Sequence, residues 1–307
     1  MRDHYAGWFA AVLLALAPGV FGAAPKPQEA YLVHPSTETV QRREAVLALA
    51  RSKDAQAGVK LVEALKDKDP MTRTLAAQGL GSLKVAAALS SLANVLANDP
   101  YPEVRQAAAT SLRQIGDPAA VDALGKAVGD VDPNVRLIAL TGLGRYRDPS
   151  TRPLVEAACK DKSVEVRRTA VYVLGRLEDP AAVPTVEQLL KDPDAAVRAG
   201  AAQTLGDLHV SDSKTALLPL LNDPDHMIRA SVARSLIMLG DNSGFDVAKA
   251  LDHDPDLAVR VVAIDALGWS KDPAAETELQ SLLTQTPAAS QPAVQEALLR
   301  TQQLRKR

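Results

Sequence analysis

The sequence is poor in several kinds of residue, and each shortage excludes a class of protein. Aromatic residues make up 3% of the 307 positions, so alanine, leucine and valine must fill the core, which suits closely packed helices better than a sheet. The one cysteine, Cys159, cannot form an intrachain disulfide and excludes a zinc site built from several cysteines. With 35 basic and 37 acidic residues the net charge is -2. This balance argues against a nucleic-acid binder, because such proteins depend on neutralising phosphates.

The sequence also lacks an apolar run long enough to cross a membrane, and its best apolar run predicts export instead. Arg2 precedes the run Trp8 to Leu16, which is shorter than the roughly 20 residues that a membrane helix needs. Small residues follow at 22–24, which gives residues 1–24 the order of a cleaved signal peptide. We therefore predict an exported protein, in the bacterial periplasm or secreted; the alternative is an N-terminal apolar helix on a cytoplasmic protein. Residues 25–37 contain three prolines and are predicted to be a linker.

One unit of sequence recurs about every 31 residues. An arginine returns at this step, with one extra residue after the second: Arg42, Arg73, Arg105, Arg136, Arg167, Arg198, Arg229 and Arg260. Alanine or valine stands three positions after each arginine, and leucine seven positions after it. Because a fixed period of this length is typical of a repeat array, we predict eight units over residues 38–284. Residues 285–307 are predicted to be a loop and a last helix, Val294 to Leu304, with a basic tail, which caps the open end of the stack.

Each unit carries the start and stop signals of two helices. The aspartate six residues before the arginine is expected to cap the first helix. Proline often follows it, at the expected first helical position, as at Pro100, Pro193, Pro224 and Pro255. Glycine is expected to end the first helix, either eight residues after the arginine (Gly81, Gly144, Gly175, Gly206, Gly268) or eleven after it (Gly116, Gly240). Asp-Pro pairs then begin several second helices, as at Asp117-Pro118, Asp148-Pro149, Asp179-Pro180 and Asp272-Pro273. The short loops place the two helices antiparallel, so we predict an all-α solenoid.

The arginine series is the most conspicuous charged feature of the repeat. A row of arginines could bind anions. It could also be structural, since stacking brings each arginine near a carboxylate of the adjacent unit and a guanidinium can hold a carboxylate with two hydrogen bonds. Because the arginine is present in every unit, we favour the structural role. The expected ladder comprises Arg73, Arg105, Arg136, Arg167, Arg198, Arg229 and Arg260 with Asp99, Asp130, Asp161, Asp192, Asp223 and Asp254.

The unit has the form Asp-Pro-x-x-x-Val-Arg-x-x-Ala-x-x-x-Leu-Gly, followed by Asp-Pro-x-x-Val-x-x-Leu. This pattern resembles the short HEAT repeat of the phycobilisome-lyase-like class, over about Thr39 to Thr284. The resemblance implies an α-solenoid of helix pairs whose second helices line the concave surface and bind partners, with the first helices on the convex side. It says little about function, because such arrays serve many unrelated roles.

Under that implied arrangement, the outward positions of the second helices are the expected partner-binding surface. They include Asp122, Lys126, Glu156, Lys160, Glu187, Lys191, Asn222, Lys249 and Gln280. These side chains alternate in sign, which suits a protein or peptide partner of mixed charge. A solvated helix face is the alternative interpretation for each of them.

The residues that could carry chemistry have structural interpretations. Cys159 could be a nucleophile or an attachment thiol, but it shares the register of Val128, Leu190, Leu221 and Leu283, which are expected to face inward. None of the histidines (His4, His34, His209, His226, His253) is followed by glutamate, so the His-Glu dyads of the HEAT-type di-iron deoxyhypusine hydroxylases are missing. We predict no metal or cofactor site.

Together these features predict a non-catalytic scaffold or adaptor that holds a partner protein or peptide along the concave face of the array. The alternative that the resemblance implies is a lyase or lyase-like subunit of the phycobilisome-lyase type, acting on a chromophore-bearing protein. The predicted export signal and the inward register of Cys159 count against this alternative. DNA binding is disfavoured by the charge balance.

Overall fold

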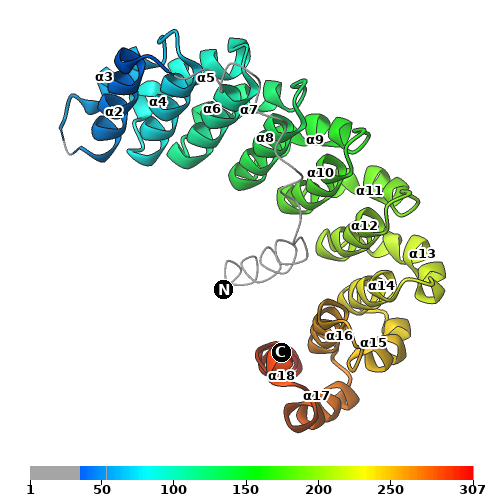
Figure 1. Cartoon of the computed structure of the whole chain (residues 1–307). Coiled ribbons are helices and arrows are strands. Elements are labelled where there is room, and N and C mark those ends of the chain that lie inside the picture. The colour runs from blue at the N-terminus through cyan, green and yellow to red at the C-terminus, as the bar shows by residue number, and fades with distance from the viewer. Residues whose placement is uncertain (1–34, 53, 307) are drawn as a thin grey trace. The chain divides into compact units, whose positions relative to one another are not determined.

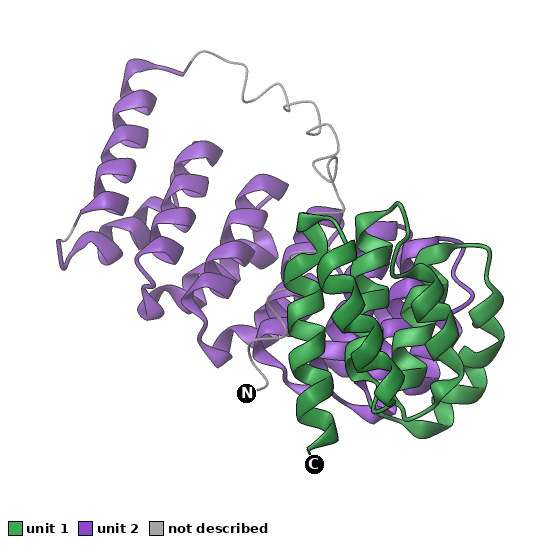
Figure 2. Ribbon diagram, turned by 90° about the horizontal axis from the view of Figure 1, so that it is seen from below, with its two compact units in different colours: residues 1–33, 209–307 green, residues 34–208 purple. Residues whose placement is uncertain are grey.

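The computed structural model describes residues 35–52 and 54–306, and within them the chain is helical with no strand. This confirms the predicted all-α fold. The chain divides into two compact units (Figure 2), whose described parts are residues 35–208, here the N-terminal unit, and residues 209–306, here the C-terminal unit. The predicted signal peptide at 1–24, and the linker up to residue 34, lie outside the described residues.

In the N-terminal unit first and second helices alternate along the chain (Figure 1). The first helices are α2 (Thr37–Arg51), α4 (Pro70–Ser82), α6 (Pro102–Ile115), α8 (Pro133–Tyr146), α10 (Val164–Leu177) and α12 (Ala195–Asp207). The second helices are α3 (Ala57–Ala64), α5 (Leu89–Asn98), α7 (Val121–Ala127), α9 (Arg152–Ala158) and α11 (Val183–Leu189). Short 3-10 turns precede α5, α7, α9 and α11: Ala86–Ala88, Pro118–Ala120, Pro149–Thr151 and Pro180–Ala182.

The C-terminal unit continues the same alternation. A 3-10 turn (Ser211–Ser213), α13 (Lys214–Leu217) and a further 3-10 segment (Leu218–Asn222) stand in the place of one second helix. Next come α14 (His226–Met238), a turn at Asn242–Gly244, α15 (Phe245–Leu251), α16 (Leu257–Trp269) and α17 (Pro273–Gln285). A turn at Ala288–Ser290 leads into α18 (Gln291–Arg305), which packs on α16 and α17. The last helix is thus longer than the predicted Val294 to Leu304.

From α4 onward the first helices begin later than the sequence suggested, whereas Ser36 caps α2 at the predicted position. Asp192 is not the N-cap of α12; its carboxylate accepts the amide of Asp194 at 2.9 Å, and Asp194 caps the helix by accepting the amide of Val197. Pro193 therefore lies before the helix, and the same correction applies to Pro100, Pro224 and Pro255. The earlier aspartate is held in the turn because it also takes part in the joint between units, which the next section describes. By contrast, Asp117, Asp148, Asp179 and Asp272 do cap the turns or helices that follow them, as predicted.

The glycines of the first helices serve two purposes. Gly116 and Gly240 take the left-handed conformation expected of a helix end, with φ of 75° and 77°. Gly81, Gly144, Gly206 and Gly268 lie inside their helices, as does Gly175, so the prediction that they end them is wrong. Close packing explains two of these positions: a Cβ on Gly81 would lie 2.8 Å from Cα of Ser111, and one on Gly268 would lie 2.7 Å from Cα of Ala297.

Within the N-terminal unit the implied placement of the two kinds of helix is reversed. Figure 1 shows the first helices on the inner side of this curved row and the second helices on its outer side. Successive first helices pack closely (α4 on α6, α6 on α8, α8 on α10, α10 on α12), whereas successive second helices touch little apart from α5 and α7. Alanine and glycine on the first helices allow this close approach, and the row bends toward the side where its helices are nearest. The leucine seven residues after each arginine is fully buried from Leu80 to Leu267.

Candidate functional site

The arginine ladder joins each repeat of the N-terminal unit to the next repeat. Arg105 donates from Nε and Nη2 to the two carboxylate oxygens of Asp130, at 2.8 and 2.7 Å, and from Nη1 to the carbonyl oxygen of Asp99 at 2.9 Å. One guanidinium thus ties its own helix to the turn before it and to the turn of the following unit. The equivalent ion pairs are Arg42–Asp67, Arg73–Asp99, Arg136–Asp161 and Arg167–Asp192.

The electrostatics of the ladder agree with a structural role. Hydrogen bonds from Arg167 hold the pKa of Asp192 below its ordinary value, and those to Asp130 raise the pKa of Arg105. Arg105 and Arg136 are 8% and 6% exposed, so these guanidinium groups have little surface left for an external anion. From Arg42 to Arg167 the ladder therefore forms the joints between neighbouring repeats.

The C-terminal unit departs from this pattern. Arg229 donates to the carbonyl oxygens of Asp223 and Pro224, at 2.7 and 3.2 Å, while the carboxylate of Asp254 is hydrogen-bonded to Nδ1 of His226. Arg260 reaches the hydroxyl of Ser290 at 3.3 Å, because the array ends there. Arg198 donates to the carbonyl oxygen of Asp192 at 2.8 Å within the N-terminal unit, and its expected partner Asp223 belongs to the C-terminal unit.

The predicted partner-binding residues are scattered over second helices and their ends. Asp122, Lys126, Lys160, Lys191, Asn222, Lys249 and Gln280 are exposed, and Glu156 and Glu187 are half-buried. Several of them pair within the protein: Lys126 with Asp122 at 2.8 Å, Glu156 with Arg152 at 2.9 Å and Lys249 with Glu278 at 2.6 Å. In the N-terminal unit they lie on the outer row (Figure 1), so the inner surface is made by other residues.

That inner surface is formed by the exposed stripe of the first helices. On α6, α8 and α10 it carries four arginines outside the ladder: Arg113 on α6, Arg145 on α8, and Arg168 and Arg176 on α10. We call these four the inner arginines. Sequence reasoning missed them because they do not recur at one register in every repeat. They stand out only once the structure shows that the first helices lie on the inner side.

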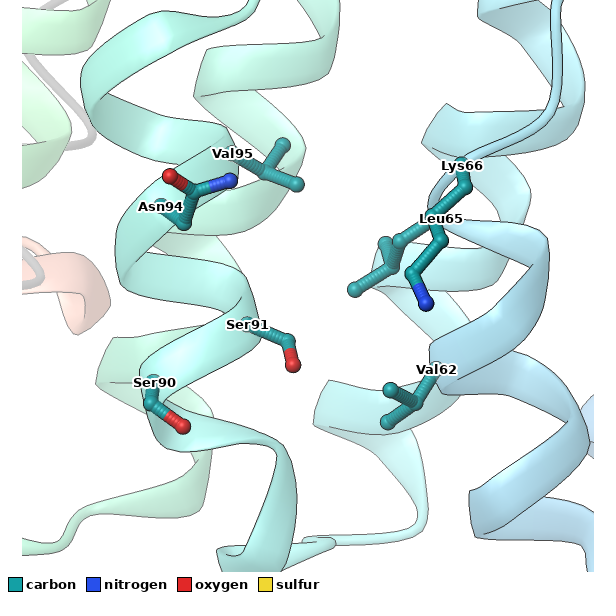
Figure 3. A pocket seen from close by; sticks show the side chains of 7 residues that line it. All are labelled: Val62, Leu65, Lys66, Ser90, Ser91, Asn94 and Val95. Carbon is teal, nitrogen blue, oxygen red and sulfur yellow. The ribbon is translucent and has the colours of Figure 1, made fainter.

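The outer row has shallow grooves where neighbouring second helices diverge. One, of about 260 Å³, lies between α3 and α5 and is lined by Val62, Leu65, Lys66, Ser90, Ser91, Asn94 and Val95 (Figure 3). A second, of about 290 Å³ between α5 and α7, is lined largely by alanines. The first groove holds Ser90 and Ser91 together with Lys66, but Lys66 pairs with Glu63, at 3.5 Å, and among the described residues no hydrogen bond joins Lys66 to either serine.

The candidate chemical residues do not form a site in the described part of the chain. Cys159 is 3% exposed, and burial raises the pKa of its thiol to about 12, as expected for a core residue. No group of three or more histidine, cysteine, aspartate or glutamate side chains in residues 35–52 and 54–306 could hold a metal ion. Over the same residues no helix is long and apolar enough to cross a membrane.

Comparison with known proteins adds relatives of several kinds. The deoxyhypusine hydroxylase of Arabidopsis thaliana is 33% identical over 102 residues, which is 32% of this chain and 32% of that protein, so the match spans about a third of the length of this curated relative. Among solved structures, the YibA protein of Escherichia coli superposes with a TM-score of 0.55 at 21% identity, covering 88% of this chain and 98% of that one. The complex of CpcE and CpcF of phycocyanin lyase from Nostoc sp. gives a TM-score of 0.46 at 20% identity, covering 80% of this chain and 94% of that one.

The family follows from the repeats themselves. A family model described as HEAT repeats matches in overlapping windows, at residues 29–113, 89–164, 121–193, 151–237 and 216–299. These windows cover the ladder, the helix pairs and most of the terminal helix. The chain belongs to the HEAT-repeat family, which confirms the resemblance of its repeat unit.

Proposed function

We propose that this protein is a non-catalytic scaffold that binds another protein along the inner face of its array. The observation that carries the proposal is how the repeated charged groups are used. The ladder arginines and aspartates are occupied in joints between units, and the remaining polar side chains form an extended surface on successive first helices. Solenoids of this kind present such surfaces to partners.

The competing interpretation is a lyase acting on a chromophore-bearing protein. That chemistry would call for an accessible nucleophile or acid–base pair. Cys159 is buried with a raised pKa, and no other described group stands in for it. We therefore place the scaffold first. Co-expression with a bilin source tests the choice: covalent transfer of the chromophore, or tight chromophore binding, would overturn it.

We further propose that the scaffold acts after export, because residues 1–24 have the order of a signal peptide. Mass spectrometry of the N-terminus from fractionated native host cells tests this step. A chain that begins after about residue 24 in the exported fraction supports it. A full-length chain confined to the cytoplasm contradicts it.

Crosslinking in the native host tests the scaffold itself. We expect a defined partner crosslinked to first-helix residues of the N-terminal unit, identified by mass spectrometry of the crosslinked peptides. Crosslinks only within the chain, or a partner bound solely to the outer row, would argue against the proposal.

A further inference from the structure

The inner arginines share one surface. In α10, Glu165, Arg168, Tyr172 and Arg176 follow each other at steps of three or four residues, so they lie along one helix face. In α8 the same stripe contains Leu137, Ile138 and Arg145. In α6 the position of Arg145 is held by Gln114, and Arg113 lies beside it at the edge of the stripe. Because α6, α8 and α10 pack side by side, these stripes are neighbours and form one continuous face.

The four inner arginines are not used in ion pairs. Over the residues that the structure describes, none makes a hydrogen bond or ion pair with a carboxylate. Arg168 acts on Glu165 only through its charge, which helps to lower the pKa of that carboxyl. Nε of Arg113 is buried without a hydrogen-bond partner. Nη2 of Arg145 reaches over the end of α6, lying 3.6 Å from where a Cβ on Gly116 would stand. By contrast, each ladder arginine of α4, α6, α8 and α10 holds an aspartate.

Helix electrostatics explain only part of this arrangement. Arg113, Arg145 and Arg176 stand in the last turns of their helices, where the helix dipole favours a cation by about 0.3–1 kcal/mol. Arg168 stands near the start of α10, where the dipole disfavours a cation. Outside the ladder, α6, α8 and α10 carry two acidic residues, Glu103 and Glu165, against these four arginines. Glu165 is itself bound to the hydroxyl of Ser163 at 2.6 Å.

Apolar side chains lie among these cations. Leu137 and Ile138 on α8 and Tyr172 on α10 are half-buried, so each leaves part of its surface open to a partner. Apolar anchors surrounded by charged groups are the usual arrangement of a protein-binding surface.

We propose that the inner face of α6, α8 and α10 binds an acidic, extended segment of a partner protein. Its carboxylates pair with the inner arginines, and its apolar side chains pack on Leu137, Ile138 and Tyr172. This inference rests on the proposed scaffold function and adds the chemistry of the partner. A nucleic acid is a poorer fit, because its phosphate backbone offers no apolar side chain to pack on Leu137 and Ile138.

Helix spacing predicts the pattern of the segment. Packed helices lie about 8–10 Å apart, and a polyproline-type chain advances about 3.1 Å per residue. An acidic residue at every third position, about 9 Å apart in such a chain, would meet an arginine on each successive helix. The fitting sequence therefore alternates one acidic residue with two apolar or neutral ones.

The test uses the purified full chain and a fluorescent peptide of about four Glu-Leu-Pro repeats, chosen for its near-extended conformation. Binding is followed by fluorescence anisotropy, with a Lys-Leu-Pro peptide of the same length, single-stranded DNA and phosphatidylserine vesicles as competing probes. The acidic peptide is expected to bind best. Tighter binding of DNA or vesicles, or equal binding of the lysine peptide, would overturn the inference.

A matched pair of variants locates the surface. Arg145→Glu/Arg176→Glu reverses two inner charges and should weaken the acidic peptide about tenfold or more, since two ion pairs become two repulsions. Lys160→Glu/Lys191→Glu makes the same change in net charge at exposed positions beside the second helices, and should change the affinity less than about twofold. Circular dichroism checks that both variants fold. If Arg145→Glu/Arg176→Glu does not fold, Arg145→Gln/Arg176→Gln takes its place in the binding measurement. Equal losses in both double variants would contradict the assignment.

The same variants separate this inference from the scaffold function. If the partner crosslinked in the host stays bound to Arg145→Glu/Arg176→Glu as tightly as to the unaltered chain, the scaffold function stands. The partner then does not bind at the inner arginines, and this inference fails. If no partner is crosslinked to either chain, the scaffold function itself fails.

Discussion

Asp252 is a charged residue at a core position, and its removal should stabilise the protein in a pH-dependent way. It stands 31 residues after Leu221 and 31 before Leu283, in the inward register of Val128 and Cys159. Its side chain is 1% exposed, and Oδ2 has no hydrogen-bond partner among the described residues. The nearest cation is His253, with Nε2 at 3.8 Å from Oδ1. Lys249 is occupied by Glu278 at 2.6 Å.

These surroundings set the sign and size of the effect. Burial raises the pKa of Asp252 from 3.8 to about 6; the charge of Glu278 adds to this, and His253 and Lys249 oppose it. The folded state therefore holds this proton more tightly than the unfolded state, so stability falls as the pH rises from about 4 to 6. Above pH 6 the full penalty applies. A shift of about two units corresponds to about 3 kcal/mol, since one unit is worth about 1.4 kcal/mol.

The assay is urea unfolding of Asp252→Asn and Asp252→Leu at about pH 7.5 and pH 4. Both variants remove the charge, and leucine restores the residue type of the register. We expect a gain of about 2–3 kcal/mol at the higher pH and less than about 1 kcal/mol at the lower, where the native carboxyl is already protonated. The control Asp246→Asn removes an exposed carboxylate of the same helix, α15. Equal gains of Asp252→Asn at both pH values, or no gain at pH 7.5, would refute the reasoning.

Three further predictions test the packing of the array. Asp130→Ala removes the carboxylate that neutralises Arg105 and should cost about 2–4 kcal/mol in urea unfolding, because it leaves a nearly buried charge; a loss below about 0.5 kcal/mol would show that the ladder is dispensable. Cys159 should resist iodoacetamide at pH 8 in the folded protein and react after unfolding, as its raised pKa requires; labelling at the rate of a free thiol would contradict its burial. Gly81→Ala forces a methyl group within 2.8 Å of Cα of Ser111 and should destabilise by about 1–3 kcal/mol, whereas unchanged thermal unfolding would mean that α4 and α6 can separate freely.

The sequence was sufficient for those features that repeat. Arginine, alanine and leucine return at fixed spacing, and a spacing fixes which residues share a helix face. The ladder partners from Arg73 to Arg167 followed from the same register, whereas Asp254 is bound by His226 and not by Arg229. Helix starts were harder, because two acidic residues stand close together, as in Asp192 and Asp194, and either can cap. The structure shows that the first holds the turn and the second caps the helix.

The side toward which the row of helices in the N-terminal unit bends could not be predicted from these spacings. Curvature depends on small differences between two sets of helix spacings, and these depend on how side chains meet across neighbouring units. Gly144 against Val173 and Gly175 against Thr204 bring the first helices together, yet in sequence these glycines look like helix ends. The expected partner surface therefore fell on the outer row, and the inner arginines went unnoticed.

Departures from the repeat also indicate where the inner stripe is open. Its central position, five residues after the ladder arginine, holds Thr110, Thr141 and Tyr172 in α6, α8 and α10. In α14 and α16 the same position holds Arg234 and Asp265. Asp265 accepts from Nε of Arg234 at 2.7 Å and from Nη1 of Arg300 at 2.5 Å.

The third member of that buried group comes from the terminal helix. Arg300 lies on α18, and its guanidinium stands 4.6 Å from the ring centre of Trp269. Arg234 and Arg300 are 6% and 8% exposed, so in the C-terminal unit the polar groups of the stripe are turned to each other and fix the capping helix. In α6, α8 and α10 the corresponding residues are Thr110, Thr141 and Tyr172, and among the described residues the inner arginines form no ion pair. The two units thus use one register for different ends: in the C-terminal unit it holds the terminal helix α18, and on α6, α8 and α10 it contributes to the surface proposed above for a partner.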